Sequence, residues 1–135
     1  MKRVVVIGGG FAGTLIAKRL ERDFLITLID SKDYFEYTPG ILRLIVNPKK
    51  LNKIRIPHKN YLKKSEIVVG NVSYIDMNYV HVGRKNIGYD YLVICSGSNY
   101  SCPVEEKGVF IASRSNSLLE AYNKISKAKR ILIIG

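Results

Sequence analysis

The chain has 135 residues, 47% of them hydrophobic, a size and composition typical of one domain with a substantial core. No apolar run reaches the roughly 18 residues that a membrane-spanning helix needs, and the N-terminus lacks the apolar segment and cleavage site of a signal peptide. We therefore expect an intracellular, cytoplasmic protein. Its net charge of +11 favours anionic partners over cationic ones.

The first stretch predicts a strand followed by a glycine-rich turn. Residues 4–7 read Val-Val-Val-Ile, which is typical of a strand buried on both faces. Gly8, Gly10 and Gly13 follow at G-x-G-x-x-G spacing, and a helix is expected from Ala12 to Leu20. In this motif the first glycine permits the turn, the second lets the backbone approach a pyrophosphate, and the third lets helix and strand pack closely. The unpaired amides at the helix start favour a phosphate there.

The second apolar stretch, residues 24–29, predicts another buried strand that ends in Asp30. Asp30 lies 20 residues beyond Gly10, where an acid binds the ribose hydroxyls of a dinucleotide. The alternative is a plain βαβ unit with a solvated Asp. On the intervening helix we expect Leu15 to face the core, with Ile16, Ala17 and Leu20, and Glu21 to face solvent, with Lys18, Arg19 and Arg22.

Residues 31–40 predict a loop rich in aromatic and turn residues, which either packs onto the domain or reaches over a cofactor with Lys32 near phosphate or adenine. A short apolar segment at 41–46 and a short helix from His58 to Lys64 follow. His58 lies among lysines, with no acid close to it in sequence, so we expect it at the surface.

The same region is strongly basic. Between Glu36 and Glu66 there is no acid, and the stretch holds Arg43, Lys49, Lys50, Lys53, Arg55, Lys59, Lys63 and Lys64. A solvated basic face is the preferred interpretation, and a surface for anionic lipid or for nucleotide phosphates is the alternative. We expect no nucleic-acid partner, because neither a recognition helix nor an RNP-type aromatic strand is present.

From Glu66 onward the period changes to that of strands. Short strands are expected at 67–69, 72–75, 79–82 and 87–89, the last three as an antiparallel meander. A fully buried strand at 91–94 then runs into the small-residue turn Cys95–Ser98. A further strand is expected at 109–111, a capping box at 117–120 begins a helix, and 131–134 form an apolar strand before Gly135. Cys95 and Cys102 have neither C-x-x-C nor zinc spacing, so no metal site is predicted.

Three motifs carry a resemblance to a known family: the glycine turn with Asp30, the segment Tyr-Asp-Tyr-Leu-Val-Ile-Cys-Ser-Gly-Ser at 89–98, and the strand–glycine pattern at 131–135. In this order they resemble the two-dinucleotide-binding flavoproteins of the pyridine nucleotide-disulfide oxidoreductase superfamily. The middle motif there usually reads YDYLVIATGS, so Cys95 and Ser96 are mild departures. The resemblance implies an α/β, Rossmann-like FAD/NAD(P)-binding three-layer domain with a mainly parallel sheet and a small antiparallel meander.

The resemblance also implies a domain plan and a set of cofactor contacts. Residues 1–129 would form the N-terminal part of the FAD-binding domain, and residues 130–135 the first strand of a truncated NAD(P)H-binding domain. Around the pyrophosphate, ribose, adenine and flavin, the implied FAD contacts are Gly8, Gly10, Phe11, Ala12, Gly13, Asp30, Ser31, Lys32, Pro39, Val72, Ser96 and Gly97. No catalytic side chain is implied, since the flavin itself carries the chemistry.

Segments at 26–30, 34–39 and 56–57 resemble the type II NADH dehydrogenases, with the sulfide:quinone reductases and apoptosis-inducing-factor-like oxidoreductases as close relatives. Residues 1–94 contain no cysteine, which argues against the disulfide reductases. The implied activity is FAD-dependent hydride transfer from the co-substrate NAD(P)H, then delivery to a quinone-type acceptor, with peripheral contact at the cytoplasmic membrane face. The alternatives are an FAD- or adenine-nucleotide-binding module without turnover, and a basic lipid- or nucleic-acid-binding protein.

We further expect the chain to be the N-terminal fragment of a longer enzyme and inactive alone. It would hold FAD weakly and self-associate through residues 130–135, because unpaired apolar strands favour pairing with another chain.

Overall fold

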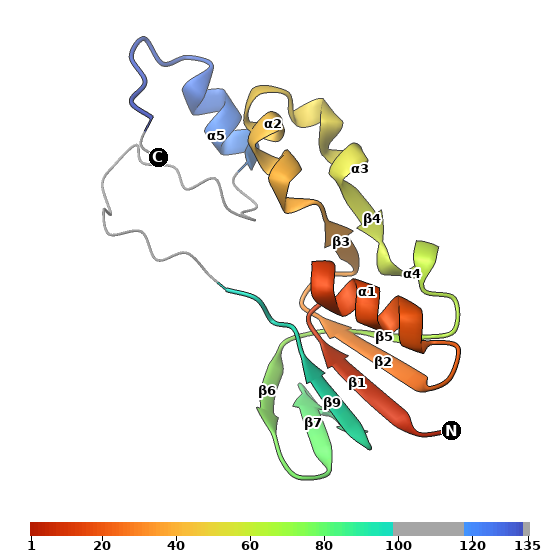
Figure 1. Ribbon diagram of the computed structural model, residues 1–135. Helices are drawn as coiled ribbons and strands as arrows, with labels where there is room; N and C mark the ends of the chain where they lie inside the picture. The colour runs from red at the N-terminus through yellow and green to blue at the C-terminus, as the bar shows by residue number, and fades with distance from the viewer. Residues whose placement is uncertain (99–117, 134–135) are drawn as a thin grey trace. The chain divides into compact units, whose positions relative to one another are not determined.

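The computed structural model describes residues 1–98 and 118–133 (Figure 1). The chain divides into two compact units. The first comprises residues 1–35 and 56–98, and the second comprises residues 36–55 together with residues from 99 onward. The short strands β3 (Tyr34–Glu36) and β4 (Arg55–Pro57) form a two-stranded sheet. The chain passes from the first unit to the second within β3 and returns to the first unit within β4.

The first unit is built on a four-stranded parallel sheet in the order β5-β2-β1-β9. Its strands are β1 (Arg3–Ile7), β2 (Leu25–Asp30), β5 (Glu66–Val69) and β9 (Tyr91–Ile94). β1 lies between β2 and β9, with Val5 opposite Thr27 on one side and Leu92 on the other. The sequence-based prediction of a parallel α/β fold is confirmed.

Alternating side chains of β1 divide the core of this unit between the two faces of the sheet. On one face Val4 and Val6 pack with Ala17 of helix α1 (Phe11–Leu20) and with Leu62, which follows the short helix α4 (His58–Tyr61). On the other face Val5 packs with the meander formed by β6 (Val72–Ile75), β7 (Tyr79–Val82) and β8 (Lys85–Gly88). Helix, parallel sheet and meander are the expected three layers (Figure 1).

Three burial predictions in this unit are wrong. β9 is an edge strand of the sheet, so Tyr91 and Ile94 are 48% and 62% exposed and the strand is not fully buried. Leu15 is exposed, because the buried stripe of α1 runs through Gly13 and Ala17. Glu21 is buried, because its carboxylate accepts hydrogen bonds from the segment that follows α4.

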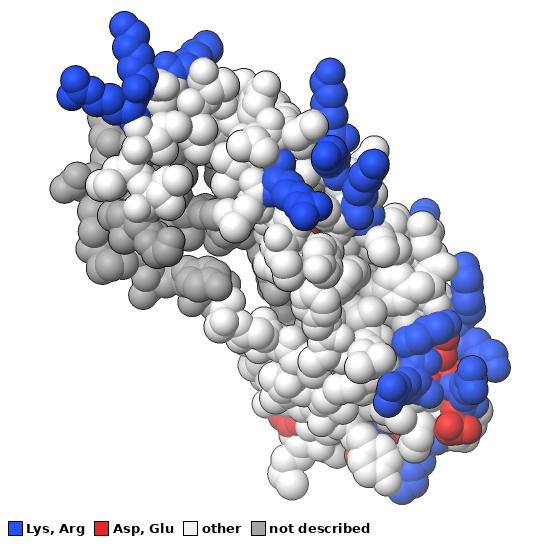
Figure 2. Space-filling model, turned by 45° about the horizontal axis from the view of Figure 1, so that its top comes forward, with Lys and Arg blue, Asp and Glu red and all other residues white. Residues whose placement is uncertain are grey.

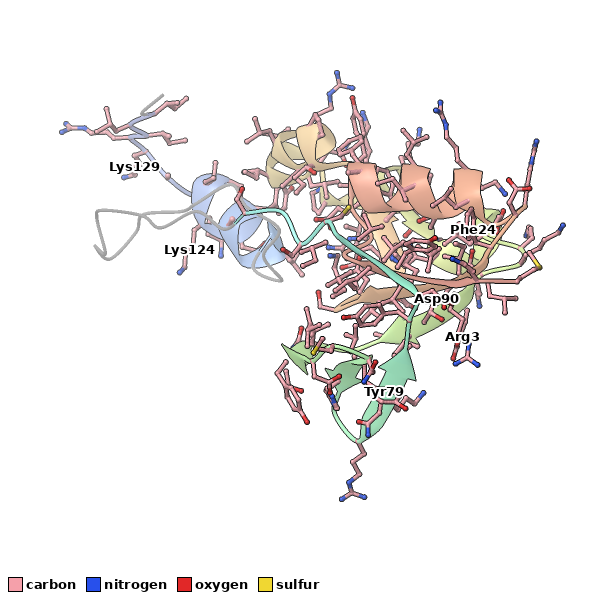
Figure 3. The ribbon with its side chains drawn as sticks, turned by 60° about the horizontal axis from the view of Figure 1, so that its bottom comes forward. Arg3, Phe24, Tyr79, Asp90, Lys124 and Lys129 are labelled. Atoms are coloured by element: carbon pink, nitrogen blue, oxygen red, sulfur yellow. The ribbon has the colours of Figure 1, made fainter. Side chains whose placement is uncertain are left out.

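The amino edge of the sheet is fixed by a backbone-to-side-chain contact. The Arg3 amide donates to the Asp90 carboxylate at 2.6 Å, and its carbonyl accepts from the Asp90 amide at 2.9 Å. Figure 3 labels both residues, with Tyr79 on the meander. Asp90, in the turn that precedes β9, therefore ties β9 to the start of β1.

The second unit is helical. It contains η1 (Thr38–Gly40), α2 (Ile41–Val46), η2 (Pro48–Lys50), α3 (Leu51–Ile54) and α5 (Leu118–Ile125), and α2 contacts both α5 and η2. Ile41, Leu44 and Ile54 form its small core. The Nε atom of Arg55 lies 2.8 Å from a carboxylate oxygen of the buried Glu36.

Some sequence-based predictions fall at the limits of the described residues. The strand at 109–111 lies outside them, as does Ser117, the first residue of the capping box. Residues 131–133 are described, and they are exposed with no strand pairing, since a strand needs a hydrogen-bonded partner and none of the described residues supplies one. That residues 130–135 begin a second domain stays a prediction.

Of the basic residues at 43–64, Arg55 is half-buried and the others are exposed. Figure 2 shows Lys and Arg side chains projecting from the surface, as expected of a solvated basic stretch. Among the described helices, none has the length and hydropathy required to cross a bilayer.

Candidate functional site

The parallel sheet places three of the predicted motifs at one edge. Gly8 follows β1, Asp30 ends β2, and Ser96 and Gly97 follow β9. Because these strands are parallel, their carboxyl ends lie together, and ligands of open α/β sheets bind outside this edge. The Gly8 amide donates to the Ile29 carbonyl at 2.7 Å, and the Cys95 amide donates to the Ile7 carbonyl at 2.7 Å.

The glycine turn is sterically closed to larger residues. Gly8 has a φ of +98°, and a Cβ there would lie 2.3 Å from the Cys95 carbonyl oxygen. A Cβ at Gly13 would lie 1.8 Å from the Gly8 carbonyl oxygen. Both obstacles are backbone atoms that side-chain rotation does not relieve. The turn and the close approach of α1 therefore need glycine at these two positions.

Helix α1 begins directly after the turn with Gly10 as its N-cap, and its first turn carries no acidic side chain. Phe11 and Ala12 are exposed at this end, and the Phe11 ring packs edge-to-face on Phe35, with 5.1 Å between the ring centroids. The backbone N–H groups and positive dipole end of a helix start suit an anion when its first turn carries no acidic side chain.

The Asp30 carboxylate joins the end of β2 to the glycine turn. Its Oδ2 atom accepts a hydrogen bond from the Gly9 amide at 2.7 Å. Its Oδ1 atom lies 3.1 Å from the Lys32 amide, 3.3 Å from the Ser31 hydroxyl and 3.5 Å from Lys32 Nζ. Asp30 is only 6% exposed. Burial by itself would raise the pKa of Asp30, but contacts with His58, Lys32 and Gly9 outweigh it and lower that pKa to about 2. Asp30 is therefore a carboxylate at neutral pH.

His58 is buried beneath the glycine turn, so its predicted surface position is wrong. It has no exposed surface, and its Nε2 atom lies 3.4 Å from Asp30 Oδ2. The reason is tertiary: its amide donates to the Asp33 carbonyl at 2.9 Å, and α4 then directs the ring toward β2. The predicted helix over 58–64 is also shorter, because it ends at Tyr61.

Tyr61 and Thr14 continue this network from His58 back to the turn. The Tyr61 hydroxyl makes a short hydrogen bond with His58 Nδ1 and lies 3.2 Å from Thr14 Oγ1. The Thr14 hydroxyl in turn donates to the Gly9 carbonyl at 3.1 Å. Burial raises the pKa of Tyr61 above its ordinary value, so its hydroxyl stays protonated.

Comparison with known proteins decides the family. The family model of the pyridine nucleotide-disulphide oxidoreductases matches residues 2–135. The chain belongs to this family.

Three similar proteins are each longer than this chain. It is 34% identical over 143 residues to apoptosis-inducing factor homolog B of Dictyostelium discoideum, covering 99% of this chain and 35% of that protein. It is 30% identical over 154 residues to the NAD(P)H coenzyme A polysulfide/persulfide reductase of Pyrococcus horikoshii, covering 99% of this chain and 34% of that protein. The crystal structure of the Aquifex aeolicus sulfide:quinone oxidoreductase superposes with a TM-score of 0.81 at 31% identity, covering 94% of this chain and 32% of that one. The chain thus spans about a third of the length of these relatives.

The structure gathers most, not all, of the residues that the family resemblance implies. Gly8, Gly10–Gly13, Asp30–Lys32 and Ser96–Gly97 lie at the carboxyl edge of the sheet. Val72 is half-buried at the start of β6, against the core formed by the meander. Pro39 lies in η1, exposed and in the second unit. The binding roles of all these residues stay predictions.

The sequence analysis missed two features of this site. The first is the pair His58 and Tyr61, whose i, i+3 spacing places both on one face of α4 and was the available signal. The second is Gly9, which occupies a variable position of the motif. A Cβ there would lie 2.3 Å from Asp30 Oδ2 and 2.4 Å from His58 Cε1.

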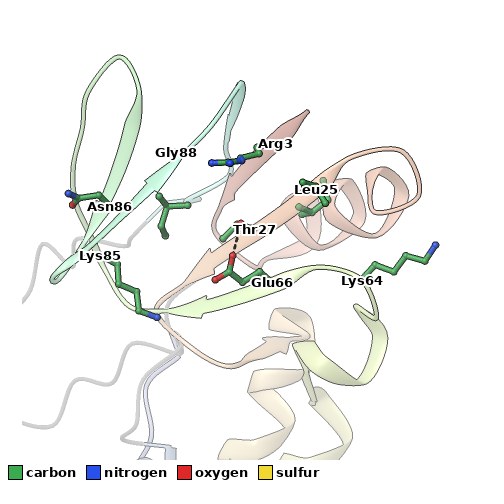
Figure 4. A pocket seen from close by; sticks show the side chains of 10 residues that line it. Arg3, Leu25, Thr27, Lys64, Glu66, Lys85, Asn86 and Gly88 are labelled. Carbon is green, nitrogen blue, oxygen red and sulfur yellow. Dashed lines mark hydrogen bonds between the residues drawn. The ribbon is translucent and has the colours of Figure 1, made fainter. Parts of the chain in front are cut away.

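A separate depression of about 620 Å³ lies at the opposite, amino edge of the sheet (Figure 4). Arg3, Leu25 and Glu66, the first residues of three parallel strands, line it, together with Lys64 and Lys85. Glu66 accepts a hydrogen bond from the Thr27 hydroxyl at 3.2 Å. This depression lies away from the glycine turn and is therefore separate from the candidate dinucleotide site.

Proposed function

We propose that this chain forms the FAD-binding part of a flavin-dependent NAD(P)H oxidoreductase. The observation that carries the proposal is the joint placement of an acid-free helix start and the ionised Asp30 carboxylate at the carboxyl edge of a parallel sheet. Family membership supports it, since the Pyrococcus horikoshii relative is named as an NAD(P)H-dependent reductase.

The residues at this edge fit an adenine dinucleotide. The amides at the start of α1, with Gly8, Gly10 and Gly13, would receive the pyrophosphate. Asp30 would accept hydrogen bonds from the adenosine ribose, with Ser31 and Lys32 beside it, and Val72 would meet adenine through its backbone. Ser96 and Gly97 would approach the cofactor from the end of β9. Gly97 has a φ of +72°, and no atom of the described residues lies within 4 Å of the place where a Cβ would be, so within that part of the chain the approach is open. When bound, the flavin supplies the redox chemistry by accepting a hydride from the nicotinamide.

The finer parts of the proposal concern the acceptor, the domain plan and the location. A quinone-type acceptor is supported by the name of the Aquifex aeolicus sulfide:quinone oxidoreductase, 31% identical in structure-based alignment. We also propose that residues 130–135 begin a second, NAD(P)H-binding domain, that the protein is cytoplasmic with peripheral membrane contact, and that the 135-residue chain alone has no turnover.

The direct test is cofactor and ADP binding by the purified chain. Binding of added FAD, seen as a shifted flavin spectrum, supports the proposal, and bleaching by NADH is expected only of a longer protein that includes the NAD(P)H-binding domain. Replacing Asp30 by Asn should weaken ADP binding by about tenfold, since a hydrogen bond to a charged group is worth about 1.5–3 kcal/mol. ADP binding that is absent from the wild-type chain, or unchanged in D30N, would contradict the proposal.

A nucleotide-binding module without turnover is the second candidate. It is favoured by one observation, namely that the polar contacts described at the carboxyl edge centre on Asp30 and the glycine turn, the expected ADP half of the site. A longer protein that binds ADP and FAD but whose flavin NADH does not bleach would support this candidate.

A further inference from the structure

The two histidines of the chain meet carboxylates in different ways. In the meander, His81 has hydrogen-bond partners on both ring nitrogens, Asn86 at 2.8 Å and Asp76 at 2.6 Å. His58 has one on Nδ1, from Tyr61. Its Nε2 atom is fully buried and has no hydrogen-bond partner within the described part of the chain, because the 3.4 Å contact with Asp30 Oδ2 is of ion-pair length without hydrogen-bond geometry. Such an atom calls for an explanation beyond core packing.

The neighbours of the two ring nitrogens of His58 indicate where its proton lies. A carboxylate accepts hydrogen bonds and cannot donate one, so in the neutral imidazole the Asp30 oxygen beside Nε2 favours the ring proton on that nitrogen, and Tyr61 then donates its one proton to Nδ1. In the imidazolium both nitrogens carry protons. In either state, therefore, the His58 nitrogen that lies 3.4 Å from Asp30 Oδ2 carries a proton, and its contact with the carboxylate is electrostatic.

The ionisable groups around the ring come from three segments. Asp30 is at the end of β2, Lys32 is in the turn beyond it, and Tyr61 is on α4 itself. From α1, Lys18 Nζ donates to the Tyr61 carbonyl at 2.6 Å and so holds α4 in place. The glycine turn contributes backbone alone: a Cβ at Gly9 would lie 2.6 Å from His58 Nε2.

These contacts divide the two oxygens of Asp30 between different tasks. Oδ2 faces the protein, held by the Gly9 amide and the His58 ring. Oδ1 has contacts of 3.1 Å or longer with Ser31 and Lys32. The contacts from the Ser31 hydroxyl and Lys32 Nζ come from side chains that are not buried, so a ribose hydroxyl can take their place at Oδ1.

We propose that His58 is a positioning residue of the nucleotide site, fixing the Asp30 carboxylate against the glycine turn so that Oδ1 is presented to the ribose diol of the cofactor. The inference rests on the proposed function, since it assigns the ligand group that Asp30 recognises. His58 does not contact the ligand in this scheme, and it acts through Asp30.

The test compares ADP with 2′,3′-dideoxy-ADP, which lacks both ribose hydroxyls, by calorimetry on the 135-residue chain. The ratio of the two affinities isolates diol recognition, because all other contacts of the ligand are common to both. We expect the wild-type chain to prefer ADP by about tenfold or more, the factor for one charge-assisted hydrogen bond.

Two substitutions of His58 separate positioning from packing. In H58Q the amide nitrogen reaches about as far as Nε2, so the preference for ADP should be largely retained. In H58N the amide is too short to reach Asp30, so the preference should fall to about twofold or less. Y61F keeps the aromatic ring of residue 61 and removes its hydroxyl, so the orientation of the His58 ring is then held by packing alone. This variant should reduce the preference for ADP by about threefold. H81N is the matched control, and its preference should equal that of the wild type.

Each outcome has a distinct meaning. A preference lost in H58N and retained in H58Q and H81N supports the inference. A uniform loss of affinity for both ligands in H58N, with the preference intact, overturns it and leaves His58 a structural residue. Absence of ADP binding to the wild-type chain overturns the proposed function, and ADP binding without preference for the diol overturns the role of Asp30.

Discussion

Replacing Gly9 by Ala is the sharpest test of the network under the glycine turn. The new Cβ would lie 2.3 Å from Asp30 Oδ2, 2.4 Å from His58 Cε1 and 2.6 Å from His58 Nε2. Both neighbours are buried, at 6% and 0% exposure, so neither side chain can turn out to solvent without opening the core. We expect G9A to be strongly destabilised.

The magnitude follows from two contributions. Overpacking in a filled interior costs about 1–3 kcal/mol. If Asp30 moves away, the 2.7 Å hydrogen bond from the Gly9 amide is lost as well, and a bond to a charged group is worth about 1.5–3 kcal/mol. Together these predict a loss of about 3–5 kcal/mol in the free energy of unfolding. Because His58 is one of the two obstacles, the G9A/H58A double variant should be less destabilised than the sum of the single variants, by about 1 kcal/mol or more.

Urea unfolding of the chain, followed by circular dichroism at an unchanged m-value, measures these differences. Gly88 provides the matched control. A Cβ there would make ordinary contacts of 3.5 Å with Arg3 and Tyr79, so G88A should lie within about 1 kcal/mol of wild type. If G9A is as stable as G88A, or if G9A and H58A are strictly additive, the described placement of His58 against Gly9 is wrong.

Three further predictions concern stability and association. Contacts hold the folded-state pKa of Asp30 at about 2, against an ordinary 3.8, and that of Glu21 at about 2, against 4.5. Because both folded-state pKa values are depressed, the stability that these carboxylates contribute is fully present above about pH 4.5 and should be lost as the pH falls toward 2. Acid titrations monitored by circular dichroism measure this loss, which should be smaller in D30N. E21Q should lower the free energy of unfolding by about 2–3 kcal/mol, since the Glu21 carboxylate accepts from the Lys63 and Lys64 amides at 3.1 Å and from Lys18 Nζ at 2.6 Å. The control E66Q, at an exposed position, should change it by less than about 0.5 kcal/mol. Ile131, Leu132 and Ile133 are 57%, 84% and 83% exposed, so replacing all three by Asn should shift the chain toward monomer in sedimentation velocity, and a wild-type chain that already sediments as a monomer would contradict this.

The local features of the fold were predictable from sequence. The run Val4–Ile7 and the apolar stretch at 24–29 each alternate between two buried faces, which identifies central parallel strands without knowledge of their neighbours. Gly8, Gly10 and Gly13 are recognisable because their spacing reflects one local turn, and Asp30 is recognisable because it ends the next strand.

Other features depend on segments that meet only in three dimensions. The exposure of β9 follows from its place at the sheet edge, and the burial of Glu21 follows from amides more than 40 residues away. The sequence around His58 is polar and basic, so its pattern indicates a surface helix.

Burial of His58 required the chain to return from the second unit through β4 and place α4 against the end of β2. A polar side chain is buried where a partner of complementary charge compensates its lost hydration, and here that partner, Asp30, is 28 positions earlier in the sequence. The sequence by itself determined the parallel sheet, the glycine turn and the acid beside it. The tertiary structure alone decided which buried groups hold that acid in place, because their contacts depend on distances in space and leave no periodic signal along the chain.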